Sequence, residues 1–160
     1  MTRWRPADAR PSPWYGATLA WWAPFERDAK RRHPEEITTI IGHRQLTYRT
    51  RLEVPGRVEP IPVSVSFFAD PPYDTYGLPA EDYPRVWADR GRASPHRMPG
   101  GSLCLYSPFD PAGRRWRAEL GLRCLLNLTR DHLFFEHNWR TNHIWLGPEA
   151  PHGLPRRRAA

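Results

Sequence analysis

The 160-residue sequence has little cysteine, a single lysine and no long apolar run. Two cysteines, Cys104 and Cys124, cannot build a disulfide framework, and neither belongs to a Cys-x-x-Cys pair of the kind that holds structural zinc. No apolar stretch approaches the roughly 18 residues of a membrane span, and residues 1–6 lack the apolar segment of a signal peptide. We therefore expect a cytoplasmic protein with two free thiols.

Basic residues dominate the charge, with a net charge of +7 and a pI near 10.1. Such a balance can indicate nucleic-acid binding, because Lys and Arg neutralise phosphates. Here the arginines are spread along the chain and gather at its ends, and no helix-turn-helix, zinc-finger or RNA-recognition signature is present. We expect a basic surface that aids encounter with an acidic partner, and no nucleic-acid or membrane partner.

Seven histidines raise the question of a metal site. No His-Glu-x-x-His motif occurs, and His132 and His137 are five residues apart, a spacing that does not share a helix face. The aspartates of the segment 70–94 are more typical of turn-forming side chains than of metal ligands; they are Asp70, Asp74 and Asp82. We expect neither a metal ion nor another cofactor.

The length suits one domain with a real core. Composition suggests a Pro- and Arg-rich arm at 1–12, a domain at 13–153 and a basic tail at 154–160. From Pro13, aromatic side chains recur at helical spacing as far as Phe25. Pro24 should kink or divide this helix, which ends at His33-Pro34.

A period of two along 46–54 predicts a strand with one wet face, and 37–41 and 62–68 are its expected antiparallel neighbours in a β-meander. Residues 70–94 show no sustained period, but their aromatic content predicts a loop that packs on the sheet. Residues 107–113 cannot be regular structure. From Trp116 onward an apolar helical stripe follows, and Cys124 should lie in the core beside it. Its members are Leu122, Leu125, Leu126, Thr129 and Leu133.

The segment 96–106 carries the clearest chemical signal. His96 precedes a turn that Pro99, Gly100 and Gly101 impose, and Cys104 follows between two leucines. Cys104 is the candidate nucleophile, with its pKa lowered from about 8.5 by His96, Arg97 or the turn amides. The alternative is a short buried strand in which Cys104 acts as a small hydrophobic residue.

This segment and its flanks resemble ubiquitin-conjugating (E2) enzymes, and in closer detail the bacterial E2-like proteins of type II CBASS antiphage systems. The resemblance covers roughly residues 14 to 153. The stretches that carry it are His96, 101–105, the proline loop 108–111 and Trp116, with 68–77 and 82–86 before the cysteine and 135–139, 145–147 and His152 after it.

The resemblance implies an α+β E2-like fold with an N-terminal helix, an antiparallel β-meander, a long active-site loop and C-terminal helices. It places the catalytic role on Cys104, with His96 beside it. The Asn of the eukaryotic His-Pro-Asn pattern is missing, so the oxyanion role falls to the Gly100-Gly101 amides or Ser102, or stays unassigned. Asp110 is a weak candidate for orienting an amine, and the resemblance gives Glu136 and His152 the task of holding the C-terminal segment.

The implied function is a thioester at Cys104 with the C-terminus of a cGAS/DncV-like nucleotidyltransferase, or of a ubiquitin-like partner, followed by transfer to an acceptor in antiphage defence. The chain has no glycine-rich nucleotide motif, so an E1-like activating protein is a further implied partner. Two alternatives stay open. One is a non-catalytic E2-like scaffold that binds and stabilises the nucleotidyltransferase; the other is a Cys-His hydrolase using His96 or His152.

Overall fold

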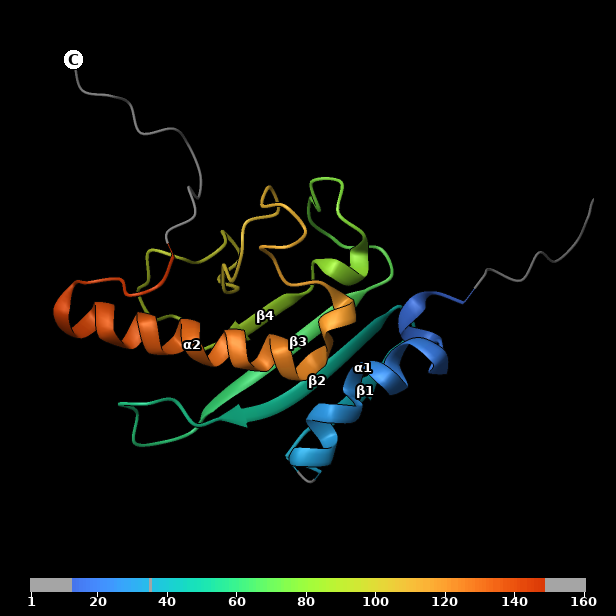
Figure 1. Cartoon of the computed structure of the whole chain (residues 1–160), viewed down its shortest axis with the longest axis horizontal. Helices are drawn as coiled ribbons and strands as arrows, with labels where there is room; N and C mark the ends of the chain where they lie inside the picture. The colour runs from blue at the N-terminus through green and yellow to red at the C-terminus, as the bar shows by residue number, and fades with distance from the viewer. Residues whose placement is uncertain (1–12, 35, 149–160) are drawn as a thin grey trace, which may run out of the picture.

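A computed structural model describes residues 13–34 and 36–148. The predicted arm at 1–12, the predicted tail at 154–160 and His152 lie outside these described residues. Within them, two α-helices and a four-stranded antiparallel sheet form an α+β fold, as Figure 1 shows. The α+β class predicted from the sequence is confirmed.

The sheet is a meander of β1 (Thr38–Ile41), β2 (Gln45–Leu52), β3 (Ile61–Phe68) and β4 (Arg85–Ala88), in that order. Neighbouring strands are antiparallel, with Tyr48 opposite Val65 and Val65 opposite Val86. All three side chains are buried, whereas Arg49 is exposed. The period of two in β2 therefore sorts its side chains between the core and the outer face, as predicted.

β4 was not predicted, because it lies inside the stretch 70–94 that lacks a sustained period. Its four residues are too few to show alternation against the surrounding prolines and arginines. Pairing with β3 makes it a strand, and Val86 and Ala88 then face the core. The expectation that this stretch packs down through its aromatics is confirmed, since Tyr83 is buried and accepts a 2.8 Å hydrogen bond from Tyr73 at its backbone oxygen.

The first helix, α1 (Leu19–Arg32), begins later than predicted and is not divided at Pro24. A separate 3-10 turn (Tyr15–Ala17) precedes it, and the break falls at Thr18, whose backbone is extended. Pro24 costs α1 one backbone hydrogen bond. Aromatic packing on both sides of it holds the helix in place, because Trp21 stacks on Phe25 at 4.7 Å and Phe25 meets Phe67 of β3 at 5.2 Å.

The second helix, α2 (Gly121–Asn142), lies across the sheet on the same face as α1, and the two helices also pack against each other (Figure 1). The predicted stripe is confirmed, since all five of its members are buried. Helical structure begins later than predicted: Trp116 precedes a 3-10 turn (Ala118–Leu120) and is a buried core residue. Cys124 was wrongly predicted to be core; it is exposed, because it lies on the flank of α2 away from the stripe.

Candidate active site around Cys104

The segment that carries Cys104 forms a tight reversal of the chain. The Gly101 amide donates to the Met98 carbonyl oxygen at 2.8 Å, and the Met98 amide donates back to the Ser102 oxygen at 2.8 Å. Below the turn, the Cys104 amide donates to the His96 oxygen at 3.0 Å. Gly101 has φ +83°, a conformation that favours glycine. The predicted turn is confirmed, and it places His96 and Cys104 side by side at its base.

One side of this segment is joined to the sheet. The Leu103 amide donates to the Val86 oxygen of β4 at 2.8 Å, and the Leu103 side chain is buried in the core. Cys104, the next residue, is half-buried. The buried strand residue of this segment is therefore Leu103, while Cys104 stands where the core meets the surface.

The other side of the segment is clamped to α2 by a buried ion pair. Arg97 donates from Nε to Glu136 Oε1 at 2.9 Å and from Nη2 to Oε2 at 2.7 Å, and Glu136 is 0% exposed. The Nη1 atom of Arg97 donates to the backbone oxygens of Ala88 at 2.7 Å and Gly101 at 3.2 Å. One side chain thus joins α2, the end of β4 and the turn.

The clamp continues into a wider network. Arg140 donates to Glu136 Oε2 at 3.0 Å and to Asp89 Oδ2 at 3.3 Å. Asp89 also binds Arg57, at 2.5 Å between Oδ2 and Nη1. In the described part of the chain, Glu136 therefore holds the cysteine turn through Arg97; the task that the resemblance gives it together with His152 lies partly outside the described residues and stays a prediction. Arg97, named from the sequence as a cation for the thiol, is committed to this network.

Burial acts to raise the pKa of Glu136, and hydrogen bonds from His132, Arg97 and Ser94 lower it more, so that it falls to about 2. The His132 Nε2 atom lies 3.4 Å from Oε1, whereas Arg97 makes two shorter contacts, so we assign the larger share of the stabilisation to Arg97. Glu136 is ionised at neutral pH. The turn is consequently held by charge-assisted hydrogen bonds.

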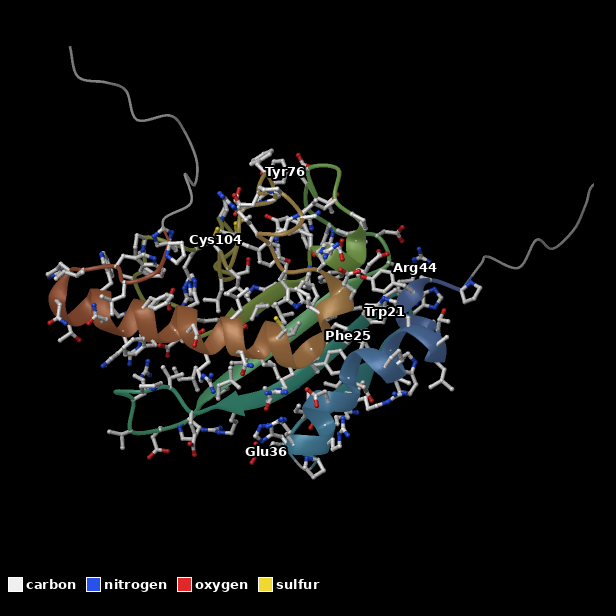
Figure 2. All side chains as sticks on the ribbon, in the orientation of Figure 1. Trp21, Phe25, Glu36, Arg44, Tyr76 and Cys104 are labelled. Atoms are coloured by element: carbon white, nitrogen blue, oxygen red, sulfur yellow. The ribbon has the colours of Figure 1, made fainter. Side chains whose placement is uncertain are left out.

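Cys104 opens onto a groove of about 340 Å³ between its own segment, the loop 107–115 and α2. Figure 2 shows the thiol among the loops beside α2. Charged and polar groups on the groove wall include His96, Asp110, Arg114 and Cys124, and its apolar wall comprises Leu120, Leu128, Phe135 and Trp145. The groove is large enough to receive a few residues of a partner chain beside the thiol.

His96 is 8% exposed, and its ring packs against Trp145 at a centroid distance of 4.1 Å. Trp145 also meets His132 at 5.2 Å. The structure therefore brings His96 to the wall of the groove that holds Cys104. Its proposed effect on the thiol stays a prediction.

The Cys104 pKa was predicted to be lowered, and in the structure it is raised, so that the thiol is held in its neutral form. Burial raises its pKa to about 11, and the positive charge of Arg85 acts in the opposite direction. A thiol with this pKa is almost fully protonated at pH 7. Chemistry at Cys104 therefore requires a base, or a change in its surroundings when a partner binds.

The groups predicted as donors to an oxyanion, the Gly100 and Gly101 amides and Ser102, lie in the turn. The Gly101 amide donates to Met98 within the turn. Gly100 and the buried Ser102 line a hollow that Arg85 also lines, which is separate from the groove of Cys104. Asp110 shares the groove with Cys104, and its amide donates to Ser107 at 3.2 Å in a local turn.

Arg85 is the residue that sequence reasoning missed. The nearest signal was its position after Tyr83-Pro84, in a stretch interpreted as loop.

The three aspartates considered from the sequence, Asp70, Asp74 and Asp82, have different partners. Asp74 accepts from a backbone amide two residues on at 2.7 Å, as a turn-forming carboxylate does. Asp70 instead accepts from the Arg44 side chain at 2.6 Å, and Asp82 from the Ala118 amide at 2.8 Å, so these two join the loop to distant parts of the chain. Across residues 13–34 and 36–148, no group of three His, Cys, Asp or Glu side chains could hold a metal ion.

Comparison with the models of known protein families gives no match, and neither does comparison with curated proteins. The fold and site define an α+β protein with a half-buried thiol on the wall of a groove. Over its described ranges, neither helix combines the length and apolar character needed to cross a membrane.

Proposed function

We propose that this chain is an E2-like acyl-transfer protein that forms a thioester at Cys104. The acyl donor is the C-terminus of a cGAS/DncV-like nucleotidyltransferase or of a ubiquitin-like partner, and transfer to an acceptor serves antiphage defence. The sequence resemblance around Cys104 names this family.

One observation carries the proposal: a half-buried thiol lines a groove, on a turn pinned to β4 on one side and to α2 on the other. A nucleophile held in place on the wall of a groove is suited to attack a carbonyl group that binds there. The order of elements supports the proposal in part: an N-terminal helix and an antiparallel meander precede the cysteine, and one α-helix follows it in the described residues, where the resemblance implies several.

In the proposed reaction the Cys104 thiol gives its proton to a base, and the thiolate sulfur bonds to the carbonyl carbon of an activated C-terminus. The carbonyl electrons move onto oxygen and form an oxyanion. When they return, the bond to the leaving group breaks, and that group departs with its electron pair. An amine then displaces the sulfur by the same two steps.

Activation of the acyl group falls to another protein. The sequence carries no glycine-rich nucleotide motif, so the C-terminus would arrive as an acyl adenylate or thioester on an E1-like partner.

The raised pKa of Cys104 favours a second candidate, a non-catalytic E2-like scaffold that holds and stabilises the nucleotidyltransferase. In that case the thiol is a half-buried structural residue, and the groove binds the partner's tail without reacting with it.

Intact-mass spectrometry under non-reducing conditions separates the two candidates. The protein is co-expressed with a cGAS/DncV-like nucleotidyltransferase encoded beside its gene. A thioester predicts an adduct with the partner's mass, released by added thiol, retained in Cys124→Ser and lost in Cys104→Ser. Association without any adduct would reject the enzyme and favour the scaffold.

A further inference from the structure

Arg85 lies directly beside the cysteine segment, at the start of β4. The hydrogen bond from the Leu103 amide to the Val86 oxygen joins the residues next to Cys104 and next to Arg85. Arg85 and Cys104 also line the same small hollow, together with Tyr83 and Tyr106. Two segments that are distant in the sequence thus bring Arg85 and Cys104 to the wall of one hollow.

Aromatic rings hold this guanidinium in place. The Arg85 Cζ atom lies 3.6 Å from the centre of the Tyr73 ring and 4.8 Å from that of the Tyr83 ring. The two rings are themselves linked, since the Tyr73 hydroxyl donates to the Tyr83 backbone oxygen at 2.8 Å. Stacking of this kind orients a cation without neutralising its charge.

Arg85 differs in this respect from the other arginines around the site. Arg57, Arg97 and Arg140 each bind a carboxylate, whereas none of the ion pairs formed within residues 13–34 and 36–148 includes Arg85. A cation that is oriented by aromatic rings, that pairs with no carboxylate in the described part of the chain and that lines the same hollow as a thiol is suited to stabilise negative charge on that thiol.

We propose that Arg85 stabilises negative charge on the thiolate form of Cys104. This inference does not rest on the proposed function. The direction in which Arg85 acts on the thiol, opposite to that of burial, agrees with this assignment.

The test measures alkylation of Cys104 by iodoacetamide as a function of pH, without any partner protein. All variants carry Cys124→Ser, because that exposed thiol would also react. Arg85→Gln removes the charge and Arg85→Lys keeps it. Arg90→Gln is the matched control, since Arg90 lies over Trp87 at 5.4 Å and does not line the hollow of Cys104.

We expect Arg85→Gln to slow alkylation at pH 8 by about tenfold, the effect of raising the thiol pKa by about one unit. Arg85→Lys should recover most of the rate, and Arg90→Gln should match the parent. Melting curves check that the fold is intact. Because stacking on Tyr73 is lost in both Arg85 variants, the difference between them isolates the charge.

Two results would overturn the inference. One is an Arg85→Gln profile that superimposes on the parent; the other is equal slowing by Arg85→Gln and Arg85→Lys, which would show that packing and not charge matters. The assay is independent of the proposed function. If the pH dependence of alkylation shifts in Arg85→Gln but mass spectrometry finds no thioester, only the acyl-transfer proposal is rejected. If a thioester forms but the pH dependence of alkylation is the same in Arg85→Gln and the parent, only the role of Arg85 is rejected.

Discussion

Glu136 makes the stability of this protein sensitive to acid in a way that can be calculated. Its carboxylate is fully buried and bonded to Arg97 and Arg140. Its pKa falls from an ordinary value of 4.5 to about 2 on folding. Because the folded pKa is the lower one, the unfolded chain takes up the proton first, and the contribution is present above pH 4.5 and lost as pH falls toward 2.

The size of this contribution follows from the shift. At about 1.4 kcal/mol per unit, it amounts to about 3 kcal/mol at pH 7, and linkage predicts that about 2 kcal/mol of it is gone by pH 3. Asp89, whose pKa is also lowered by Arg57, adds to the acid sensitivity of the whole protein. The pH dependence of the parent protein's free energy of unfolding therefore does not by itself give the contribution of Glu136.

Comparison with Glu136→Gln does isolate it. The variant keeps the shape of the side chain but cannot lose or gain the charge, so it should be less stable than the parent by about 3 kcal/mol or more at pH 7. The free-energy gap should narrow by about 2 kcal/mol at pH 3, because Glu136 is then protonated in the unfolded parent, which stabilises the unfolded state, while the folded parent is still mostly ionised. Urea unfolding followed by tryptophan fluorescence gives both free energies.

Glu119→Gln is the matched control, on an exposed glutamate that pairs with Arg117 at the surface. It should change the free energy of unfolding by less than about 0.5 kcal/mol at either pH. A gap between the parent and Glu136→Gln that stays constant from pH 7 to pH 3 would refute the reasoning, because it would mean that the charge of Glu136 contributes nothing.

Two further predictions concern the groove and the core. If His96 lowers the thiol pKa of Cys104, His96→Ala should slow alkylation several-fold at pH 7 in the Cys124→Ser background; an unchanged rate would remove His96 from the catalytic residues. Leu125 is fully buried beneath the cysteine segment, so Leu125→Ala should lower the free energy of unfolding by about 2–5 kcal/mol. Leu146→Ala is the control, because Leu146 is 52% exposed and its loss should cost well under about 1 kcal/mol. Equal losses of the two variants in urea unfolding would contradict the assigned core.

Periodic patterns in the sequence predicted the elements whose own residues bury a continuous face. β2 and β3 alternate over eight residues each, and α2 repeats its apolar stripe over several turns. The turn before Cys104 was equally predictable, because Pro99, Gly100 and Gly101 restrict the backbone locally. In each case the information lies in residues that are neighbours along the chain.

The errors fall where distant parts of the chain meet. β4 is a strand because β3 offers it an edge, and α1 is not divided at Pro24, where Phe25 packs against Phe67 of the sheet; the alternative prediction of a kink is untested. Cys124 lies close to the apolar stripe in a helical projection, yet it faces out, because the exposed flank of α2 begins there.

The same division holds for the site. The residues around Cys104 could be read as a candidate nucleophile on a turn from local chemistry alone. The partner of Arg97 could not be predicted, because Glu136 reaches it from α2. The position of Arg85 near the cysteine segment could not be predicted either, because it depends on the contact between Leu103 and β4. Local backbone preferences and side-chain period are properties of adjacent residues and can be read in one dimension, whereas burial, ion pairing and the pKa of a thiol depend on which segments the folded chain brings into contact.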